Sequence, residues 1–225
     1  MSTRVANQTS PQTAERYSPI FVESSSADLA LRRFLDILVS GLALLLLLPF
    51  LALLALVIRL DSPGPVLFTQ RRVGKDGKEF AFFKFRSMYA DAETRLDTVL
   101  STNERTGPVF KMRHDPRITR IGHWLRHSSL DEVPQLLNIL RGEMSLVGPR
   151  PALPREVALY TPIQRHRLCV TPGLTGLWQV SGRADLSFDE SIELDLEYIA
   201  HCSFALNCVI LLRTVPAVLT GRGAY

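Results

Sequence analysis

An acidic pair, Asp131 and Glu132, carries the chemistry that this sequence suggests most directly. The pair stands immediately before apolar residues at helical spacing, which predicts a helix that begins there. The positive end of a helix favours an ionised carboxylate, so one member could attack phosphorus while the other binds a divalent cation through oxygen. Adjacent helical positions point about 100° apart, which suits two separate tasks.

A purely structural interpretation competes at the same position. Ser129 to Glu132 fits the capping box S-x-x-E, in which the carboxylates only satisfy the N–H groups at a helix end. Pro134 argues against Ser129 as the cap and favours a helix that starts at Asp131, where the missing donor matters little. In either case the acidic pair lies at a helix start, and its context must decide its role.

Two cations, Lys84 and Arg86, alternate with Phe83 and Phe85 in a segment that is predicted to be a strand. Side chains of a strand point alternately to its two faces, so both cations share one face. Such a pair could hold a phosphate, although an exposed face of an amphipathic strand would have the same pattern.

An uncharged segment, residues 37–58, has about the length that crosses a bilayer. Pro49 lies near its middle and would kink a helix, and cations flank both ends, among them Arg33 and Arg59. Positive charge on both sides permits both ends to be cytoplasmic, which predicts a re-entrant helix. A single kinked span is the alternative.

Other elements are expected around these residues. Strands at 66–73 and 80–87 should form a hairpin with its turn at Asp76-Gly77. A basic amphipathic helix from Ile118, which includes Trp124, fits either the headgroup layer or an ordinary surface. The apolar segment 204–219 is interrupted by charge and proline and should lie at the interface or pack on the domain.

Composition excludes some functions. A net charge of +4 and a pI near 9.2 suit anionic partners. The basic residues are dispersed around apolar runs and no nucleic-acid-binding motif is present, so nucleic acid is not the expected partner. The three cysteines show no CxxC spacing, which argues against a disulfide framework or thiolate metal site.

The context of the acidic pair resembles the bacterial sugar transferases, also called monotopic phosphoglycosyl transferases. The resemblance extends from about Asp28 to the end of the chain, and many motifs occur in one order. They are Arg32-Arg33 with Asp36, Lys84-Phe-Arg-Ser-Met88, the stretch 116–126, Ser129 to Pro151 (SLDEVPQLLNILRGEMSLVGPRP), Pro172-Gly-Leu-Thr-Gly-Leu-Trp-Gln179 with Gly182-Arg183, and Gly223-Ala-Tyr225.

The resemblance implies a membrane helix broken at Pro49 and a catalytic domain on the cytoplasmic face of the bacterial inner membrane. It implies that Asp131 attacks the sugar-bearing phosphate of a UDP-sugar, releases UMP and passes the phosphosugar to polyprenyl (undecaprenyl) phosphate. By the same resemblance Glu132 matches the Mg²⁺ ligand and Arg150 a phosphate-binding residue. Weaker matches for substrate binding are Lys84, Arg86 and Arg183. Asn207 stands where many relatives carry an aspartate.

The expected fold is α+β: a re-entrant membrane helix and a small cytosolic domain with a short antiparallel strand pair and interfacial amphipathic helices. The expected organisation is a disordered tail at residues 1–27, the membrane helix at 28–60 and the catalytic domain at 61–225, the family's short form. Exopolysaccharide, capsule or O-antigen synthesis would follow. A membrane-associated scaffold without activity is the alternative. The sequence specifies neither the sugar nor the oligomeric state.

Overall fold

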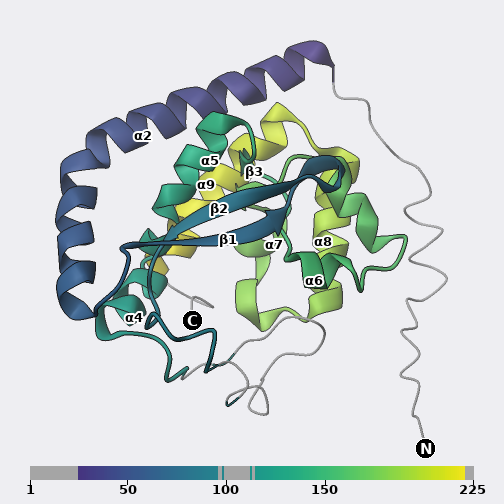
Figure 1. Cartoon of the computed structure of the whole chain (residues 1–225). Coiled ribbons are helices and arrows are strands. Elements are labelled where there is room, and N and C mark those ends of the chain that lie inside the picture. Colours follow the sequence, from purple (N-terminus) through teal and green to yellow (C-terminus); the bar gives the residue numbers. More distant parts are fainter. Residues whose placement is uncertain (1–24, 96–97, 99–111, 113–114, 221–225) are drawn as a thin grey trace, which may run out of the picture.

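The computed structural model describes residues 25–95, 98, 112 and 115–220. One long apolar helix lies against a mixed domain that contains an antiparallel hairpin, a short parallel strand pair and several shorter helices (Figure 1). The predicted α+β class is confirmed, whereas the parallel pair was not predicted. The predicted tail up to residue 24, and the motif at 223–225, lie outside the described residues.

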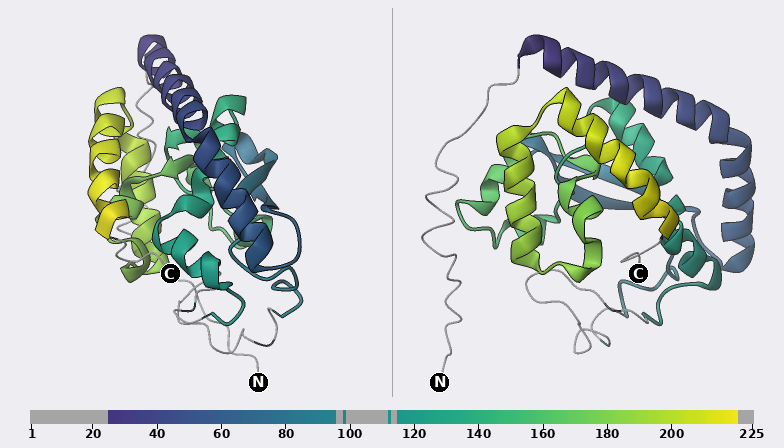
Figure 2. Two further views of the ribbon diagram at one scale, coloured as in Figure 1. Left: turned by 90° about the vertical axis from the view of Figure 1, so that its left-hand side faces the viewer. Right: turned by 180° about the vertical axis from the view of Figure 1, so that it is seen from behind.

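The long helix, α2 (Ser26–Asp61), is the only helix among the described residues that is long and apolar enough to cross a membrane. The side chain of Ser25 caps it by accepting from the Asp28 N–H at 3.2 Å. Figures 1 and 2 show a sharp bend between two straight halves of α2. Pro49 lies inside the helix, and it lacks the N–H and crowds the preceding turn, which accounts for a bend.

Most large apolar side chains of α2 face outward, while its buried residues include the polar Asp36 and Ser40. Exposed leucines include Leu42, Leu45, Leu46, Leu48, Leu53, Leu56 and Leu60. This distribution is the inverse of that of a helix in a soluble protein. The apolar surface of α2 therefore needs a cover that the domain does not provide.

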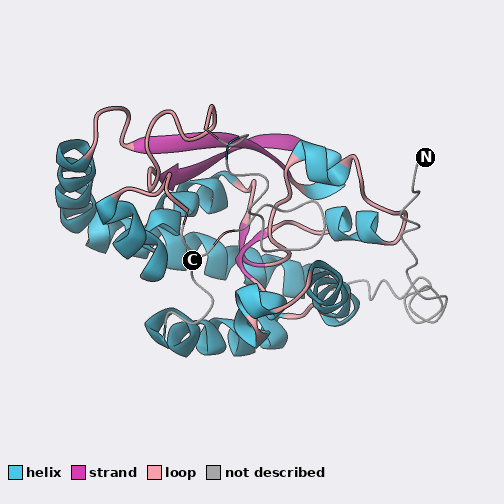
Figure 3. Ribbon diagram, turned by 90° about the horizontal axis from the view of Figure 1, so that it is seen from below, coloured by secondary structure: helices cyan, strands magenta, loops and turns pink. Residues whose placement is uncertain are grey.

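The predicted hairpin is confirmed, with strand ends shifted by one or two residues. Strand β1 (Leu67–Val73) pairs antiparallel with β2 (Glu79–Phe85). The turn is a 3-10 segment, η1 (Lys75–Gly77), in which Asp76 has a left-handed φ of 56°. The hairpin lies along one side of the helices (Figure 3).

Phe80 and Phe82 of the hairpin enter the main core, and Phe85 enters a smaller one. The main core also takes Leu136, Ile139, Met144, Leu146, Val147, Ile192, Leu196, Tyr198, Ile199 and Ile210. The smaller core joins Phe85 to Leu54 and Ile58 of α2 and to Leu125. The end of β2 thus joins the second half of α2 through the smaller core, while α2 also packs directly on α4, α9 and β3.

Strand β3 (Ser145–Val147) pairs in parallel with β4 (Gly173–Thr175). The loop that follows β3 packs so closely on β4 that a Cβ at Gly173 would lie 2.0 Å from the Gly148 nitrogen. Only glycine allows this backbone approach. The parallel pair therefore fixes where the chain after Val147 runs.

The remaining elements cover these strands. Helix α4 (Arg120–His127) begins two residues later than predicted, because the Thr119 hydroxyl caps it by accepting from the Gly122 N–H at 2.9 Å. The late apolar segment, expected at the interface or packed on the domain, forms α9 (Phe204–Thr220), which packs on α2 and β3 (Figure 2). The others are α6 (Pro154–Val157), η4 (Gln164–Cys169), α7 (Leu177–Ser181), η5 (Arg183–Asp185) and α8 (Phe188–His201).

Candidate active site

A cavity of about 800 Å³ opens between the hairpin, η3 (Leu130–Gln135) and the loop after β3. All six residues predicted for the site line this cavity: Lys84, Arg86, Asp131, Glu132, Arg150 and Arg183. They come from separate segments of the chain, so the fold brings together residues that are far apart in sequence. Their individual roles stay predictions.

The acidic pair lies on η3, a 3-10 segment, and the α-helix α5 begins only at Leu136 and ends at Arg141. The prediction of an α-helix that starts at Asp131 was therefore wrong. Pro134 explains the delay, because it lacks the N–H that an α-helical turn would use. Ser129 has a left-handed φ of 57° and makes no side-chain capping bond, so the capping box does not form.

Asp131 is 6% exposed and lines the cavity. Burial, and then the neighbouring charge of Glu132, raises the pKa of Asp131 to about 6. The cations Lys84, Arg126 and Arg150 offset part of this increase. Asp131 is thus mostly ionised at neutral pH while it is shielded from water, as a carboxylate nucleophile requires.

Glu132 forms an ion pair with Arg150, with 2.8 Å between Glu132 Oε1 and Arg150 Nη2. Burial raises the pKa of Glu132, but attraction and hydrogen bonding by Arg150 outweigh it and lower the pKa overall. The environment therefore moves the pKa values of the two carboxyl groups apart: Glu132 is ionised, whereas Asp131 titrates nearer neutrality.

Lys84 lies in β2 on the cavity side, as its alternation with Phe83 and Phe85 predicted. Burial lowers the pKa of Lys84 to about 8, although Asp131 attracts its ammonium group. The Nζ atom lies 5.7 Å from the ring centre of Phe68. A buried cation beside Asp131 is suited to hold a phosphate there.

Arg86 also borders the cavity, but its guanidinium holds the end of the membrane helix. Nη1 donates to the Pro63 carbonyl at 2.6 Å, and Nη2 donates to the Ser62 carbonyl at 2.6 Å and the Ile58 carbonyl at 3.4 Å. The Ile58 carbonyl also accepts from the Ser62 N–H that caps α2, so Arg86 adds side-chain donors to the last turn of α2 and to the two residues that follow it. No pattern in the sequence predicts this anchoring contact.

Arg183, at the start of η5, connects the cavity to the end of α9. It has a left-handed φ of 53°, and its Nη1 donates to the Ala217 carbonyl at 2.9 Å. Burial lowers the pKa of Arg183, and Glu132 opposes that decrease. Arg183 therefore interacts electrostatically with Glu132 of the acidic pair.

Further cations at the cavity were not singled out from the sequence. The positive charge of Arg126 attracts the Asp131 carboxylate, and Arg126 Nε donates to Ser87 Oγ at 3.0 Å. Arg117 forms a buried ion pair with Asp115 at 2.7 Å. Arg126 lies in the predicted basic amphipathic helix, and Arg117 lies just before it. The sequence therefore predicted their positive charge at this stretch, but not that their side chains line the cavity.

The two adjacent carboxylates, Asp131 and Glu132, are oxygen donors that could hold a divalent cation at the cavity. The described residues hold no group of three or more His, Cys, Asp or Glu side chains that could bind a metal ion. Mg²⁺ is commonly bound by one or two carboxylates together with substrate phosphates. Two carboxylates beside the cations of the cavity therefore fit Mg²⁺ only if a substrate phosphate completes its ligands.

Comparison with known proteins shows which family this chain resembles. The profile of the family described as "Bacterial sugar transferase" matches residues 27–221. Exopolysaccharide production protein ExoY of Rhizobium meliloti (strain 1021) is 40% identical over 198 residues, which are 86% of this chain and 88% of ExoY.

Two longer relatives match with similar identity. Galactosyl transferase CpsE of Streptococcus agalactiae serotype III is 44% identical over 224 residues, 95% of this chain and 48% of CpsE. Undecaprenyl-phosphate glucose phosphotransferase of Komagataeibacter xylinus is 44% identical over 214 residues, 89% of this chain and 38% of that protein. The chain thus spans about half or less of these longer relatives and most of ExoY.

Proposed function

The chain belongs to the bacterial sugar transferase family, and we propose that it transfers a hexose-1-phosphate from a UDP-sugar to undecaprenyl phosphate, releasing UMP. The relatives' names support this proposal, since they include a galactosyl transferase, an undecaprenyl-phosphate glucose phosphotransferase and an exopolysaccharide production protein. The product would initiate an exopolysaccharide or capsule at the cytoplasmic face of the inner membrane.

The buried carboxylate of Asp131, surrounded by cations in a substrate-sized cavity, carries the proposal. An Asp131 oxygen forms a bond to the sugar-bearing phosphorus, the bond from that phosphorus to the bridging oxygen breaks, and UMP leaves with the electron pair. An oxygen of undecaprenyl phosphate then attacks the same phosphorus and releases the Asp131 carboxylate. The nucleophile is regenerated without a net proton transfer to it.

The cations of the site are proposed to bind the negatively charged phosphates of the substrate. Arg150, fixed by Glu132, offers a planar guanidinium to a phosphate, and Lys84 and Arg183 add positive charge on other sides. Arg86 already donates to three backbone carbonyls, so we assign it to anchoring α2 and not to the substrate. Mg²⁺ bound through Glu132 would neutralise the diphosphate and assist departure of UMP.

Trapping the intermediate tests the covalent route. Wild-type enzyme with Mg²⁺ and labelled UDP-sugar, without lipid acceptor, should release up to one equivalent of UMP and retain the label. Asp131→Asn should do neither. Asp76→Asn is the matched control, because Asp76 lies at the exposed hairpin turn, where asparagine tolerates the left-handed φ. An adduct on the Asp131→Asn protein would identify another nucleophile.

The role of Glu132 is tested by Glu132→Gln, titrated with Mg²⁺ in the same assay. If Glu132 binds the metal, higher Mg²⁺ should partly restore UMP release in this variant. A loss of activity that does not respond to Mg²⁺ would leave Glu132 only as the partner of Arg150. UDP-glucose and UDP-galactose, compared by UMP release with acceptor present, would identify the hexose.

We also propose that α2 is re-entrant, with both ends in the cytoplasm. The sharp bend of α2, Pro49 within it and its exposed leucines support this topology (Figure 1). Single cysteines at Ser18 and Lys78, in a chain without native cysteines, should both resist an impermeant thiol reagent in intact cells and react after lysis. Labelling of one position alone in intact cells would mean that α2 spans the membrane.

A further inference from the structure

The loop that carries Arg150 is held in place by hydrogen bonds to its successive backbone carbonyls. Four consecutive carbonyl oxygens, from Pro149 to Ala152, each accept a hydrogen bond from a donor elsewhere in the chain. The donors are Gly173 N to Pro149 at 2.9 Å, Arg167 Nη2 to Arg150 at 3.2 Å, Arg72 Nη1 to Pro151 at 3.0 Å and Val73 N to Ala152 at 2.9 Å.

The sequence explains why arginine side chains donate to two of these carbonyls. Pro149 and Pro151 have no N–H, so this segment cannot form a regular ladder of reciprocal backbone bonds with a neighbouring strand. Its buried carbonyls still need donors. Backbone N–H groups of Gly173 and Val73 reach the first and last carbonyls, and guanidinium groups reach the two between them.

Arg167 is itself immobilised. Its Nε donates to Asp195 Oδ2 at 2.8 Å, its Nη2 lies 2.7 Å from the same oxygen, and its Nη1 donates to the Tyr160 hydroxyl. The guanidinium carbon lies 5.6 Å from the centre of the Tyr160 ring, and Asp195 is fully buried. A guanidinium with these partners has one available geometry, in which Nη2 also reaches the Arg150 carbonyl.

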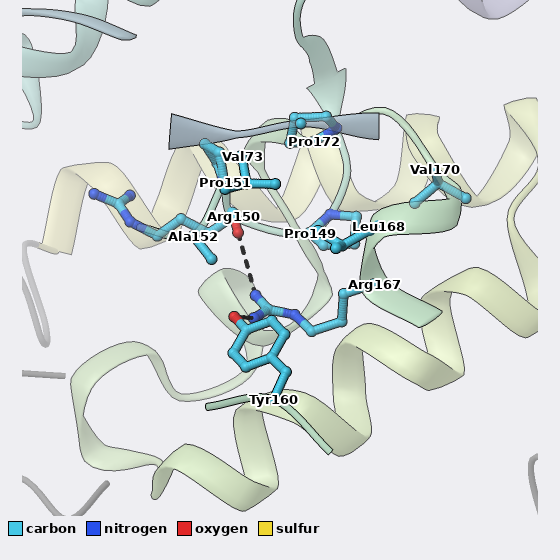
Figure 4. Close-up of a pocket in the computed structure, with 11 residues that line it drawn as sticks. Val73, Pro149, Arg150, Pro151, Ala152, Tyr160, Arg167, Leu168, Val170 and Pro172 are labelled. Atoms are coloured by element: carbon cyan, nitrogen blue, oxygen red, sulfur yellow. Dashed lines mark hydrogen bonds between the residues drawn. The ribbon is translucent and has the colours of Figure 1, made fainter. Parts of the chain in front are cut away.

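Figure 4 shows how this contact bears on the site. The Arg150 carbonyl points toward Arg167, while the Arg150 side chain runs in another direction. That side chain ends at Glu132, 2.8 Å away, beside Asp131. Fixing the carbonyl fixes the Arg150 backbone, and thereby the origin of the side chain that meets the acidic pair.

We propose that Arg167, held by Asp195 and Tyr160, is a positioning residue that orients Arg150 toward Glu132 and the substrate phosphate. This inference rests on the proposed function, because it assigns a purpose to the position of Arg150. Arg167 need not touch the transferred phosphoryl group. It acts through the backbone of Arg150, so its effect should depend on the Arg150 side chain.

A double-mutant cycle tests that dependence. Arg167→Lys, Arg150→Lys and the double variant are compared by kcat/KM for UDP-sugar with lipid acceptor present. Arg167→Lys alone should lower kcat/KM about 10- to 100-fold, because a displacement near 1 Å at a reacting group can cost about 100-fold. In the Arg150→Lys background the same change should cost less than about 3-fold.

Two further variants keep the test decisive. Arg165→Lys, an exposed position on the same 3-10 segment, should leave kcat/KM unchanged. If Arg167→Lys does not fold, Tyr160→Phe replaces it, since it removes only the hydroxyl that accepts from Nη1. Tyr160→Phe should lower kcat/KM about 3- to 10-fold in the wild-type background and have almost no effect beside Arg150→Lys.

Losses that multiply fully in the double variants would overturn the inference, because a general loss of structure does not depend on Arg150. Wild-type kcat/KM for both Arg167→Lys and Tyr160→Phe would overturn it as well. The proposed function fails in a different way: wild-type protein would then release no UMP from any UDP-sugar.

Discussion

Replacing the proposed nucleophile should make the protein more stable. Burial raises the pKa of Asp131 from 3.8 to about 6 in the folded protein. Each unit corresponds to about 1.4 kcal/mol, so the ionised carboxylate costs the fold up to about 3 kcal/mol relative to its protonated form. The attraction of Lys84 and Arg126 is already included in that pKa. Asparagine has the shape of the protonated acid and does not ionise.

The sign of the pH dependence follows from the raised pKa. Above about pH 6 the folded protein holds an ionised Asp131 at a cost, and most of this cost is lost as the pH falls through 6 toward 4, where the folded protein binds the proton and the unfolded chain, with its pKa of 3.8, begins to bind it. Asp131→Asn should therefore raise the apparent Tm in lipid nanodiscs at about pH 8. Since 1 kcal/mol shifts Tm by about 2–4 °C in a chain of this size, the increase should be several degrees, up to about 10 °C.

The assay is thermal unfolding of wild type and Asp131→Asn, followed by tryptophan fluorescence at about pH 8 and about pH 4, with Asp76→Asn as the control. The difference between the two proteins should be present at the higher pH and nearly absent at the lower. An Asn variant that is less stable than wild type at about pH 8, or a gain of equal size at both pH values, would refute the argument that burial dominates at Asp131. A functional group that destabilises its fold is a known trade-off at active sites.

Three further predictions concern activity and anchoring. Formation of the labelled adduct in a single turnover should slow about tenfold for each pH unit below about 6, because only ionised Asp131 attacks; a rate that is level from about pH 7 to 5 contradicts this. Arg150→Lys should lower kcat/KM about 10- to 100-fold despite the retained charge, as UMP release will show, because a point charge cannot replace the planar fork; wild-type turnover with normal membrane insertion contradicts it. Arg86→Lys should destabilise the fold by about 2–4 kcal/mol in denaturation, because it loses the three guanidinium hydrogen bonds to backbone carbonyls, while KM for the UDP-sugar stays within about threefold of wild type. A raised KM with unchanged stability would instead return Arg86 to the substrate site.

The sequence predicted those features that depend on local pattern. The hairpin and the long apolar helix with its proline follow from periodicity, length and turn residues, and both are present. The start of the helix at the acidic pair was missed, since Pro134 favours a 3-10 turn that propensity alone does not distinguish from an α-helix. The parallel pair β3–β4 was missed because two three-residue strands that are far apart leave no periodic signal.

The candidate site was predicted as a set of residues but not as a geometry. Lys84 and Arg86 stand two residues apart with the same charge, and the pattern placed both at a phosphate. Only the tertiary structure distinguishes their roles, because Lys84 interacts with Asp131 while Arg86 donates to carbonyls just after the end of α2. Arg167 could not have been selected from the sequence, since its function depends on a carbonyl seventeen positions earlier.

The anchoring contacts show why this enzyme would need its membrane helix fixed to the catalytic domain. Arg33 donates to the Ile139 and Leu140 carbonyls at 2.6 and 2.8 Å, and Asp36 accepts from the Leu146 N–H at 2.8 Å. These contacts join the first half of α2 to the domain.

Arg86 joins the other end of α2 to the strand that carries Lys84. Under the proposed function, one substrate arrives from water and the other is confined to the bilayer, so the cavity must lie at a fixed depth. Polar ties at both ends of a bent helix set that depth. A flexible linker between helix and domain would leave the depth undefined, because a chain of linked residues samples many heights. Anchoring of α2 is therefore part of substrate presentation and not only of attachment to the membrane.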